Sequence, residues 1–298
     1  MNRGVFFIVA AAVLWGCFPT IGRFLYSHGS DPVAASTMRA LTAAAIYAVI
    51  GVKNGDFKGI KGKDIPFFLC YGLTAVTGMY YFYHRAIDMV SIAMAAVLLY
   101  TAPAFVIIFS RIIYGEKITA SKLVSLVLTF GGAVLVCGVS GVGSNMNPLG
   151  IAFGLAAGLC YSTLTIFGRY GLERYSQRAN TFLPTIFGAL VLCVIRPVWT
   201  IPMGSVELVA GYVAIAVVGS VLPCFFYIKG LGMGVEGGRA SVIATIELVV
   251  ASLVGVIVAG DNIYPMQIVG IALVILGAAI QVTGSGPSRG ALLKSDGR

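Results

Sequence analysis

The sequence predicts an all-α membrane protein with ten transmembrane helices, arranged as two inverted five-helix repeats. Three observations support this fold class. Of the 298 residues, 58% are hydrophobic and only 10% are charged, whereas soluble domains carry roughly 25% charged residues. Apolar runs of about 20 residues, enough to cross a bilayer as a helix, recur along nearly the whole chain. The first half of the sequence also resembles the second half.

Ten apolar runs are predicted to span the membrane. With a rise of 1.5 Å per residue, each is long enough to cross a hydrocarbon core of about 30 Å. The runs are continuous, unlike the alternating segments of a transmembrane barrel. The predicted spans are residues 4–25, 32–52, 65–87, 89–113, 120–140, 149–170, 179–199, 205–229, 237–259 and 265–284.

The positive charges predict the orientation of the chain. With the N-terminus inside, every lysine and arginine falls on the cytoplasmic side except Arg23, Arg39, Arg85 and Arg196. Arg39 lies within the second span, and the other three lie outside. This bias follows the positive-inside rule and predicts that both termini are cytoplasmic. The net charge of +9 therefore reflects membrane topology and does not indicate a nucleic-acid partner.

The six cysteines all fall within predicted spans, and none forms a C-x-x-C pair. A buried cysteine in a helix behaves as a small apolar residue. We therefore expect no disulfide, no metal site and no cofactor. The chain also has no Walker motif and no soluble domain that could hydrolyse ATP.

An internal duplication divides the chain at an offset of about 145 residues. Residues 4–25 align with 150–171, so that Gly22-Arg23 matches Gly168-Arg169, and residues 115–133 align with 260–278. The predicted units are 1–141 (first five-helix repeat), 142–286 (second repeat) and 287–298 (cytoplasmic tail). Because five is odd, the second repeat enters the membrane from the opposite face. Inverted repeats of this kind give alternating access to a central site between the halves.

The duplicated pattern resembles a known family. Each half closes its fourth helix with a glycine and an acid, Gly115-Glu116 and Gly260-Asp261. This arrangement is similar to the EamA-type members of the drug/metabolite transporter superfamily. The run "YYFYH" in the third span further resembles the YddG-like amino-acid exporters of that superfamily. The resemblance implies a multi-pass protein of a bacterial inner membrane that exports amino acids.

One position departs from the family pattern. The second half of such transporters carries Glu-Pro near the start of its fourth helix, whereas "TIELV" here keeps Glu247 and has Leu248 in place of proline. Glu247 is the only carboxylate predicted in the middle of a span, where a charge costs several kcal/mol unless it is paired or faces water. It is a candidate partner for a substrate ammonium group or a proton carrier. Alternatively, it locks the two halves together.

The aromatic run of the third span supplies further candidates. Tyr80, Tyr83 and His84 share one helical face at positions i, i+3 and i+4, and we expect this face to point into a polar central cavity. An aromatic belt at the membrane interface is the alternative, and it suits Tyr81 and Phe82 best. Pairs matched by the duplication, and residues near a proline inside a span, complete the set. The predicted substrate-binding residues are Trp15, Tyr80, Tyr83, His84, Tyr100, Pro103, Tyr161, Tyr227 and Glu247.

This set of side chains suits a small zwitterion with an apolar side chain. We expect a small-molecule transporter, functional as a monomer in the lipid bilayer, that exports neutral or aromatic amino acids by alternating access. Phosphorylated cargo would require several lysine or arginine side chains deep in the spans, and only Arg39 lies there. Arg39 could equally serve as an ion partner that holds helices together. One alternative is a proton-coupled exporter of lipophilic cations or other metabolites. An intramembrane enzyme is the other, and it would need a cluster of acid–base or metal-binding residues.

Overall fold

The computed structural model describes residues 2–138 and 147–283. Within these ranges every regular element is helical, and ten helical segments are long and apolar enough to cross a membrane. The predicted fold class of ten transmembrane helices is therefore confirmed. These segments are Arg3–Ser27, Pro32–Asn54, Gly62–Ile87, Ile92–Tyr114, Ala120–Cys137, Pro148–Leu172, Gln177–Ile195, Val206–Gly232, Gly237–Ala259 and Pro265–Thr283. The predicted junction at 141/142 and the predicted tail 287–298 lie outside the described residues.

Helix ends differ from the prediction where a local signal outweighs hydropathy. The seventh span, α9 (Gln177–Ile195), was predicted to reach residue 199 but ends four residues earlier. Arg196 is extended, with φ −129° and ψ 91°, because a residue before proline avoids the helical region. The fourth span begins at Ile92 because the side chain of Ser91 accepts a hydrogen bond from the amide of Met94 at 3.1 Å and caps the helix.

Four spans are interrupted, and the interruptions occur at equivalent places in the two halves. The third span consists of a short 3-10 turn (Gly62–Asp64), α3 (Ile65–Gly72), a π-helical segment (Leu73–Gly78) and α4 (Met79–Ile87). The eighth consists of α10 (Val206–Ala216), a π-helical segment (Val217–Val221) and α11 (Leu222–Gly232). The fourth divides into α5 (Ile92–Leu99) and α6 (Ala102–Tyr114), and the ninth into α12 (Gly237–Ala244) and α13 (Ile246–Ala259).

The break in the ninth span does not depend on the missing proline. Thr245 separates α12 from α13, and its hydroxyl donates to the carbonyl oxygen of Val242 at 2.7 Å. The break precedes Glu247, which lies in the first turn of α13. Leu248 therefore replaces the expected proline without removing the interruption of this helix.

The glycine-acid pairs end the fourth span of each half in the same way. Gly115 and Gly260 have φ values of +66° and +71°, a left-handed conformation that glycine adopts without strain. The next amide bonds back by six residues in both halves, from Glu116 to the oxygen of Ser110 at 3.1 Å and from Asp261 to that of Gly255 at 3.2 Å. Each helix therefore ends at a glycine in the left-handed conformation, the residue most often found at this kind of helix terminus.

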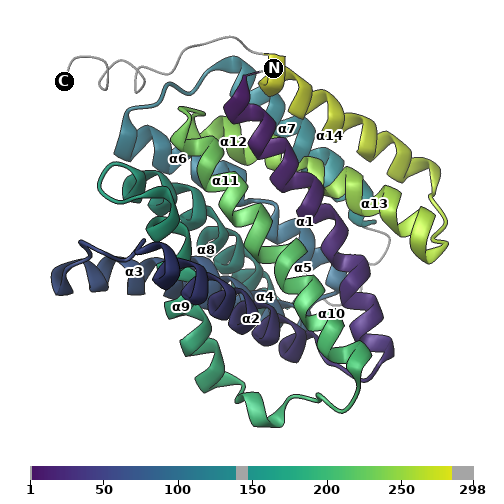
Figure 1. Cartoon of the computed structure of the whole chain (residues 1–298). Helices are drawn as coiled ribbons and strands as arrows, with labels where there is room; N and C mark the ends of the chain where they lie inside the picture. The colour runs from purple at the N-terminus through teal and green to yellow at the C-terminus, as the bar shows by residue number, and fades with distance from the viewer. Residues whose placement is uncertain (1, 139–146, 284–298) are drawn as a thin grey trace.

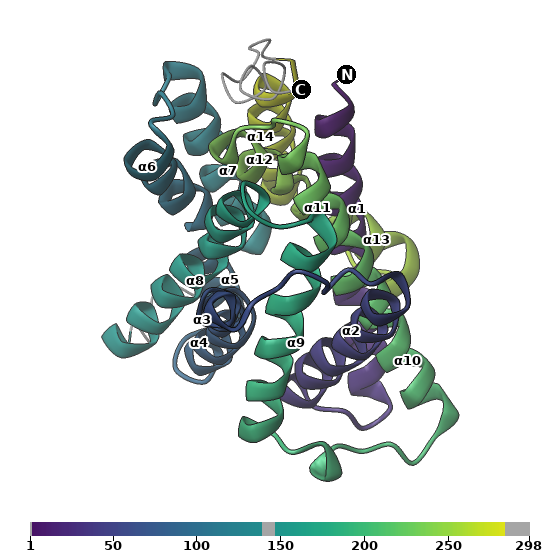
Figure 2. The same ribbon diagram turned by 60° about the vertical axis from the view of Figure 1, so that its left-hand side comes forward.

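The two halves interlock through their first helices. α1 (Arg3–Ser27) packs against α11 and α13 of the second half, whereas α8 (Pro148–Leu172) packs against α4, α5 and α6 of the first half. α2 (Pro32–Asn54) packs against α9. Figures 1 and 2 show α1 lying along α11 and α13, far from it in sequence. Residues of both halves consequently face the space at the centre of the bundle.

Close backbone approaches hold this arrangement together. α7 (Ala120–Cys137) and α14 (Pro265–Thr283), the fifth spans of the two halves, lie side by side. A Cβ atom on Gly132 would lie 2.6 Å from the carbonyl oxygen of Gly270, so the two backbones are in contact, as in small-residue interfaces of membrane helices. α1 begins and α14 ends at the same end of the molecule (Figure 1).

Candidate functional site

A cavity of about 350 Å³ lies between the two halves of the bundle. Its walls include residues of α1, α2, α4, α8, α9 and α13, so both halves contribute. Seven of the nine predicted site residues line it: Trp15, Tyr80, Tyr83, His84, Tyr100, Tyr161 and Glu247. This volume is within the range of small-molecule sites, which are mostly apolar with a few polar groups.

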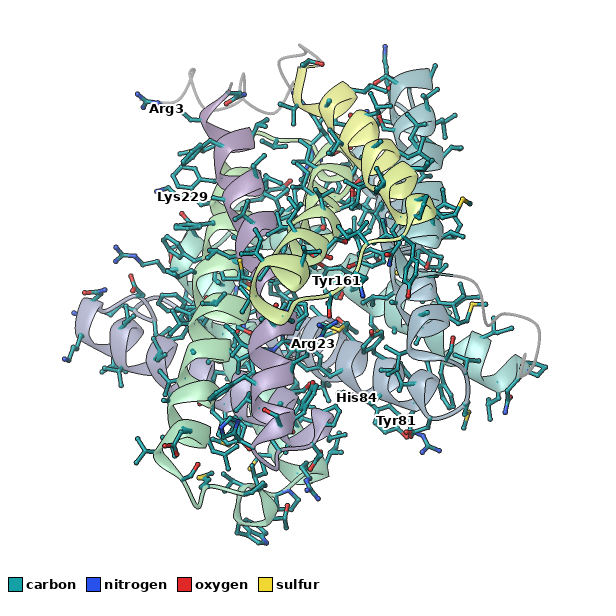
Figure 3. All side chains as sticks on the ribbon, turned by 90° about the vertical axis from the view of Figure 1, so that its right-hand side faces the viewer. Arg3, Arg23, Tyr81, His84, Tyr161 and Lys229 are labelled. Carbon is teal, nitrogen blue, oxygen red and sulfur yellow. The ribbon has the colours of Figure 1, made fainter. Side chains whose placement is uncertain are left out.

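One wall of the cavity carries the predicted face of α4. Tyr80, Tyr83 and His84 all line the cavity, and the Nε2 atom of His84 lies 3.1 Å from the hydroxyl oxygen of Ser36 on α2. Tyr81, one position further along, is 43% exposed and lies near the outer edge of the molecule, whereas Tyr161 lies among the interior helices (Figure 3). One face of α4 therefore lines the cavity while another lies at the periphery of the molecule, as the helical period predicts.

Glu247 lies on another side of the cavity, at the start of α13. Its position in the first turn places the carboxylate near the positive end of the helix dipole. Tyr100, at the break between α5 and α6, is a polar neighbour of this carboxylate. The equivalent breaks of the fourth and ninth spans therefore bring a hydroxyl and an acid together at the centre of the bundle.

The remaining two predicted residues line a smaller void next to Glu247. This void has a volume of about 20 Å³, room for about one water molecule. Pro103 and Tyr227 line it, together with Tyr100, Tyr161 and Glu247. The sequence therefore placed Pro103 and Tyr227 near the cavity, but the structure separates them from its main volume.

An aromatic cluster connects the cavity with the void. The ring of Trp15 lies 5.4 Å from that of Tyr227 and 6.4 Å from that of Tyr161, between ring centroids. The hydroxyl of Tyr227 is 2.7 Å from the Oγ1 atom of Thr165, so its polar end is satisfied within the protein. The matched pair Trp15 and Tyr161 is consequently in contact across the two halves.

Arg39 is a charged residue of the cavity that sequence reasoning did not select as a site residue. It is 6% exposed, lines the cavity, and takes part in no hydrogen bond or ion pair within the described residues. Its guanidinium carbon lies 4.9 Å from the ring centroid of Phe18 and 4.5 Å from that of Tyr80. The sequence analysis left open that Arg39 is an ion partner in helix packing. Within the described residues no carboxylate forms an ion pair with it, so the structure does not support that role. The signal that could have selected it is a single arginine deep in an apolar span.

Ion pairs join the two halves at both ends of the bundle. Glu116, which follows α6, pairs with Arg169 at the end of α8 and with Lys122 at 3.1 Å, and it accepts from the amide of Gly237 at 3.0 Å. Lys122 also contacts Glu236 at 2.9 Å. Together these side chains form a largely buried cluster, which we call the Glu116 cluster.

The duplication places a simpler contact at the matching position. Asp261, the equivalent of Glu116, pairs with Arg23, the equivalent of Arg169, at 2.6 Å. Both side chains of this pair are exposed, at 57% for Arg23 and 41% for Asp261. Two equivalent ion pairs therefore differ in burial, and this difference distinguishes the two ends of the bundle.

No group of three or more His, Cys, Asp or Glu side chains in residues 2–138 and 147–283 is arranged to hold a metal ion. The six cysteines are free thiols in the structure. The groups that the cavity offers to a solute are aromatic rings, hydroxyls, an imidazole, an acid and a guanidinium.

Comparisons with known proteins agree with this architecture. An uncharacterised transporter of Clostridium kluyveri is 25% identical over 94% of this chain and 93% of its own length. An aromatic amino acid exporter, YddG, of Ancylobacter novellus is 25% identical over 81% of this chain and 86% of its own. A solved crystal structure shares the fold with a TM-score of 0.76, covering 93% of this chain and 95% of that chain at 18% identity. The model of the EamA-like transporter family matches twice, at residues 2–138 and 148–283. The chain therefore belongs to the EamA-like transporter family.

Proposed function

We infer that this multi-pass membrane protein exports neutral or aromatic amino acids across a bacterial inner membrane by alternating access through the central cavity. The observation that carries this proposal is the combination of aromatic rings with the single deep acid Glu247 in one cavity between the halves. The units 1–141 and 142–286 act as the two inverted halves. One chain supplies a complete pathway, so the monomer is sufficient.

The chemistry of the cavity walls matches an amino acid. The carboxylate of Glu247 pairs with an ammonium group, because a charge in this apolar setting needs a partner of opposite sign. The rings of Trp15, Tyr80 and Tyr161 offer apolar area to the side chain of the solute. The exporter of Ancylobacter novellus, similar over most of both chains, supports both the substrate class and the direction.

The two ion-paired ends support alternation. In this structure one end is held by the buried Glu116 cluster and the other by the exposed pair of Arg23 and Asp261. Rocking of one inverted half against the other exchanges the environments of equivalent positions. In the opposite state, the Arg23–Asp261 contact becomes the tighter of the two.

Export of lipophilic cations is the second candidate, because Glu247 also suits a cationic solute. The guanidinium of Arg39 in the same cavity opposes this candidate, since it places a like charge beside the cargo. An amino acid also carries a carboxylate, and the attraction of this group to Arg39 offsets the repulsion of the ammonium group.

Counterflow in liposomes distinguishes the candidates. Purified protein is reconstituted into vesicles preloaded with unlabelled phenylalanine, and uptake of labelled phenylalanine, leucine and a lipophilic cation is followed at two pH values. We expect saturable uptake of the amino acids, absent from protein-free vesicles. No saturable flux of any amino acid would refute the proposal, and cation flux driven by a pH gradient would favour the alternative.

A further inference from the structure

We propose that Arg39 binds the carboxylate of the transported solute, which makes the cavity selective for zwitterions over simple amines. This inference rests on the proposed function and deepens it by assigning the second charged contact of the same cavity. Neither the sequence patterns nor the family resemblance selected Arg39 as a substrate-binding residue.

The first argument is that Arg39 is a buried cation without an ion-pair partner in the described part of the chain. Its side chain is 6% exposed, its Nε atom has no hydrogen-bond partner, and no carboxylate forms an ion pair with it within the described residues. A buried charge without a partner is strongly unfavourable. An arginine in this position is stabilised most if a ligand supplies the missing anion.

The second argument is that aromatic rings surround the guanidinium, while its N–H donors have no hydrogen-bond acceptor within the described residues. Phe18 on α1 and Tyr80 on α4 contact the group through their rings. Aromatic rings attract the guanidinium charge without taking up its N–H donors as a carboxylate does. The aromatic contacts and an anionic ligand therefore do not compete for the same hydrogen bonds.

The third argument is that the backbone makes room for this side chain. A Cβ atom on Gly219 would lie 3.2 Å from the Cδ atom and 3.3 Å from the Nη1 atom of Arg39. Gly219 belongs to the π-helical segment of the eighth span, and such segments are frequent at functional sites. The irregular helix thus accommodates the guanidinium at the cavity wall.

The fourth argument is the relation between Arg39 and Glu247. Both line the cavity, Arg39 from α2 and Glu247 from α13. They nevertheless form no ion pair with each other, although no other charge in the described residues pairs with Arg39. A zwitterion placed between them supplies an anion to Arg39 and a cation to Glu247. An amine leaves Arg39 unpaired, and a simple carboxylic acid leaves Glu247 unpaired.

Binding of two matched probes tests the assignment. The chain has two tryptophans, and Trp199 lies in a short 3-10 helix (Val198–Thr200) with 81% of its surface exposed. Trp199→Phe leaves Trp15 at the cavity as the single tryptophan, which is excited selectively over the tyrosines at long wavelength. In this background the emission of Trp15 is titrated with phenylalanine and with 2-phenylethylamine, which lacks only the carboxylate. We expect at least about tenfold tighter binding of phenylalanine, the scale of one charge-assisted hydrogen-bonded contact.

Two substitutions then isolate Arg39. Arg39→Gln removes the charge, and we expect phenylalanine affinity to fall by roughly 10- to 100-fold while the affinity for 2-phenylethylamine stays constant or rises. Arg39→Lys keeps the charge but loses the planar fork, so we expect a smaller loss that is again confined to phenylalanine. Size-exclusion profiles in detergent monitor folding, and the lysine variant carries the test if the glutamine variant does not fold.

The outcomes separate the two levels of inference. Equal weakening of both probes in the Arg39 variants would show that the residue supports the cavity without contacting the carboxylate, and this proposal would be wrong while the proposed function stands. Wild-type protein that binds phenylalanine no better than 2-phenylethylamine would overturn it as well. Absence of flux for all amino acids in the liposome assay would instead refute the proposed function itself.

Discussion

Glu116→Gln removes one negative charge from the buried Glu116 cluster without changing the shape of the side chain. The cluster contains two acids, Glu116 and Glu236, and two bases, Lys122 and Arg169. Its formal charge is therefore balanced. The glutamine can still accept from the amide of Gly237, so the substitution isolates the loss of charge and leaves the cluster with an excess positive charge.

The expected magnitude follows from the distances. The carboxylate of Glu116 lies 3.1 Å from the Nζ atom of Lys122, and two unit charges at this distance attract with about 5 kcal/mol at an effective dielectric constant of about 20. Desolvation of the charges offsets part of this attraction. Removal of one partner from a buried ion pair destabilises proteins by about 3–5 kcal/mol, and Lys122 retains Glu236. We therefore expect a loss of about 3 kcal/mol in the free energy of unfolding.

The duplication supplies a matched control. Asp261→Asn removes the equivalent charge from the exposed pair with Arg23, and exposed pairs contribute about 0–1 kcal/mol. SDS-induced unfolding in mixed micelles, followed by circular dichroism, compares both variants with wild type. We expect the loss in Glu116→Gln to persist at high salt and the loss in Asp261→Asn to disappear as screening increases. Equal losses in the two variants would refute the assignment of burial as the cause.

Three further predictions concern the cavity and the helix contacts. Glu247→Gln should lower phenylalanine flux at least about tenfold with unchanged folded yield; flux and yield falling together would indicate a structural lock between the halves. His84→Ala should weaken phenylalanine binding roughly 2- to 10-fold through loss of a polar cavity contact, whereas Tyr81→Ala should not. Equal effects of the two substitutions in a binding titration would contradict the assignment of His84 to the cavity and of Tyr81 to the periphery. Gly132→Leu should destabilise the protein by about 1–3 kcal/mol, because the backbone of α14 touches this position. Gly131→Leu should not, since a Cβ atom there meets no atom within 4 Å, and SDS-induced unfolding compares the two variants.

The sequence by itself determined the number of spans, their approximate limits and the glycine-acid helix endings. This is expected, because a bilayer requires every spanning backbone to satisfy its own hydrogen bonds, so that long apolar runs have few alternatives to a helix. Gly115 and Gly260 were identifiable for a similar reason, since a left-handed helix ending depends on local backbone chemistry. The cavity face of α4 followed from the helical period and from the polarity of His84.

Only the tertiary structure decided which apolar surfaces meet each other and which face lipid. Both surfaces are apolar in a membrane protein, so hydropathy does not distinguish them. The crossing of α1 and α8 into the opposite halves, and the break at Thr245 without a proline, therefore had no signal in the sequence pattern. Arg39 shows the same limit at the site. Within the described residues it forms no ion pair, and this depends on which side chains the neighbouring helices place beside it, which the sequence of one span does not record.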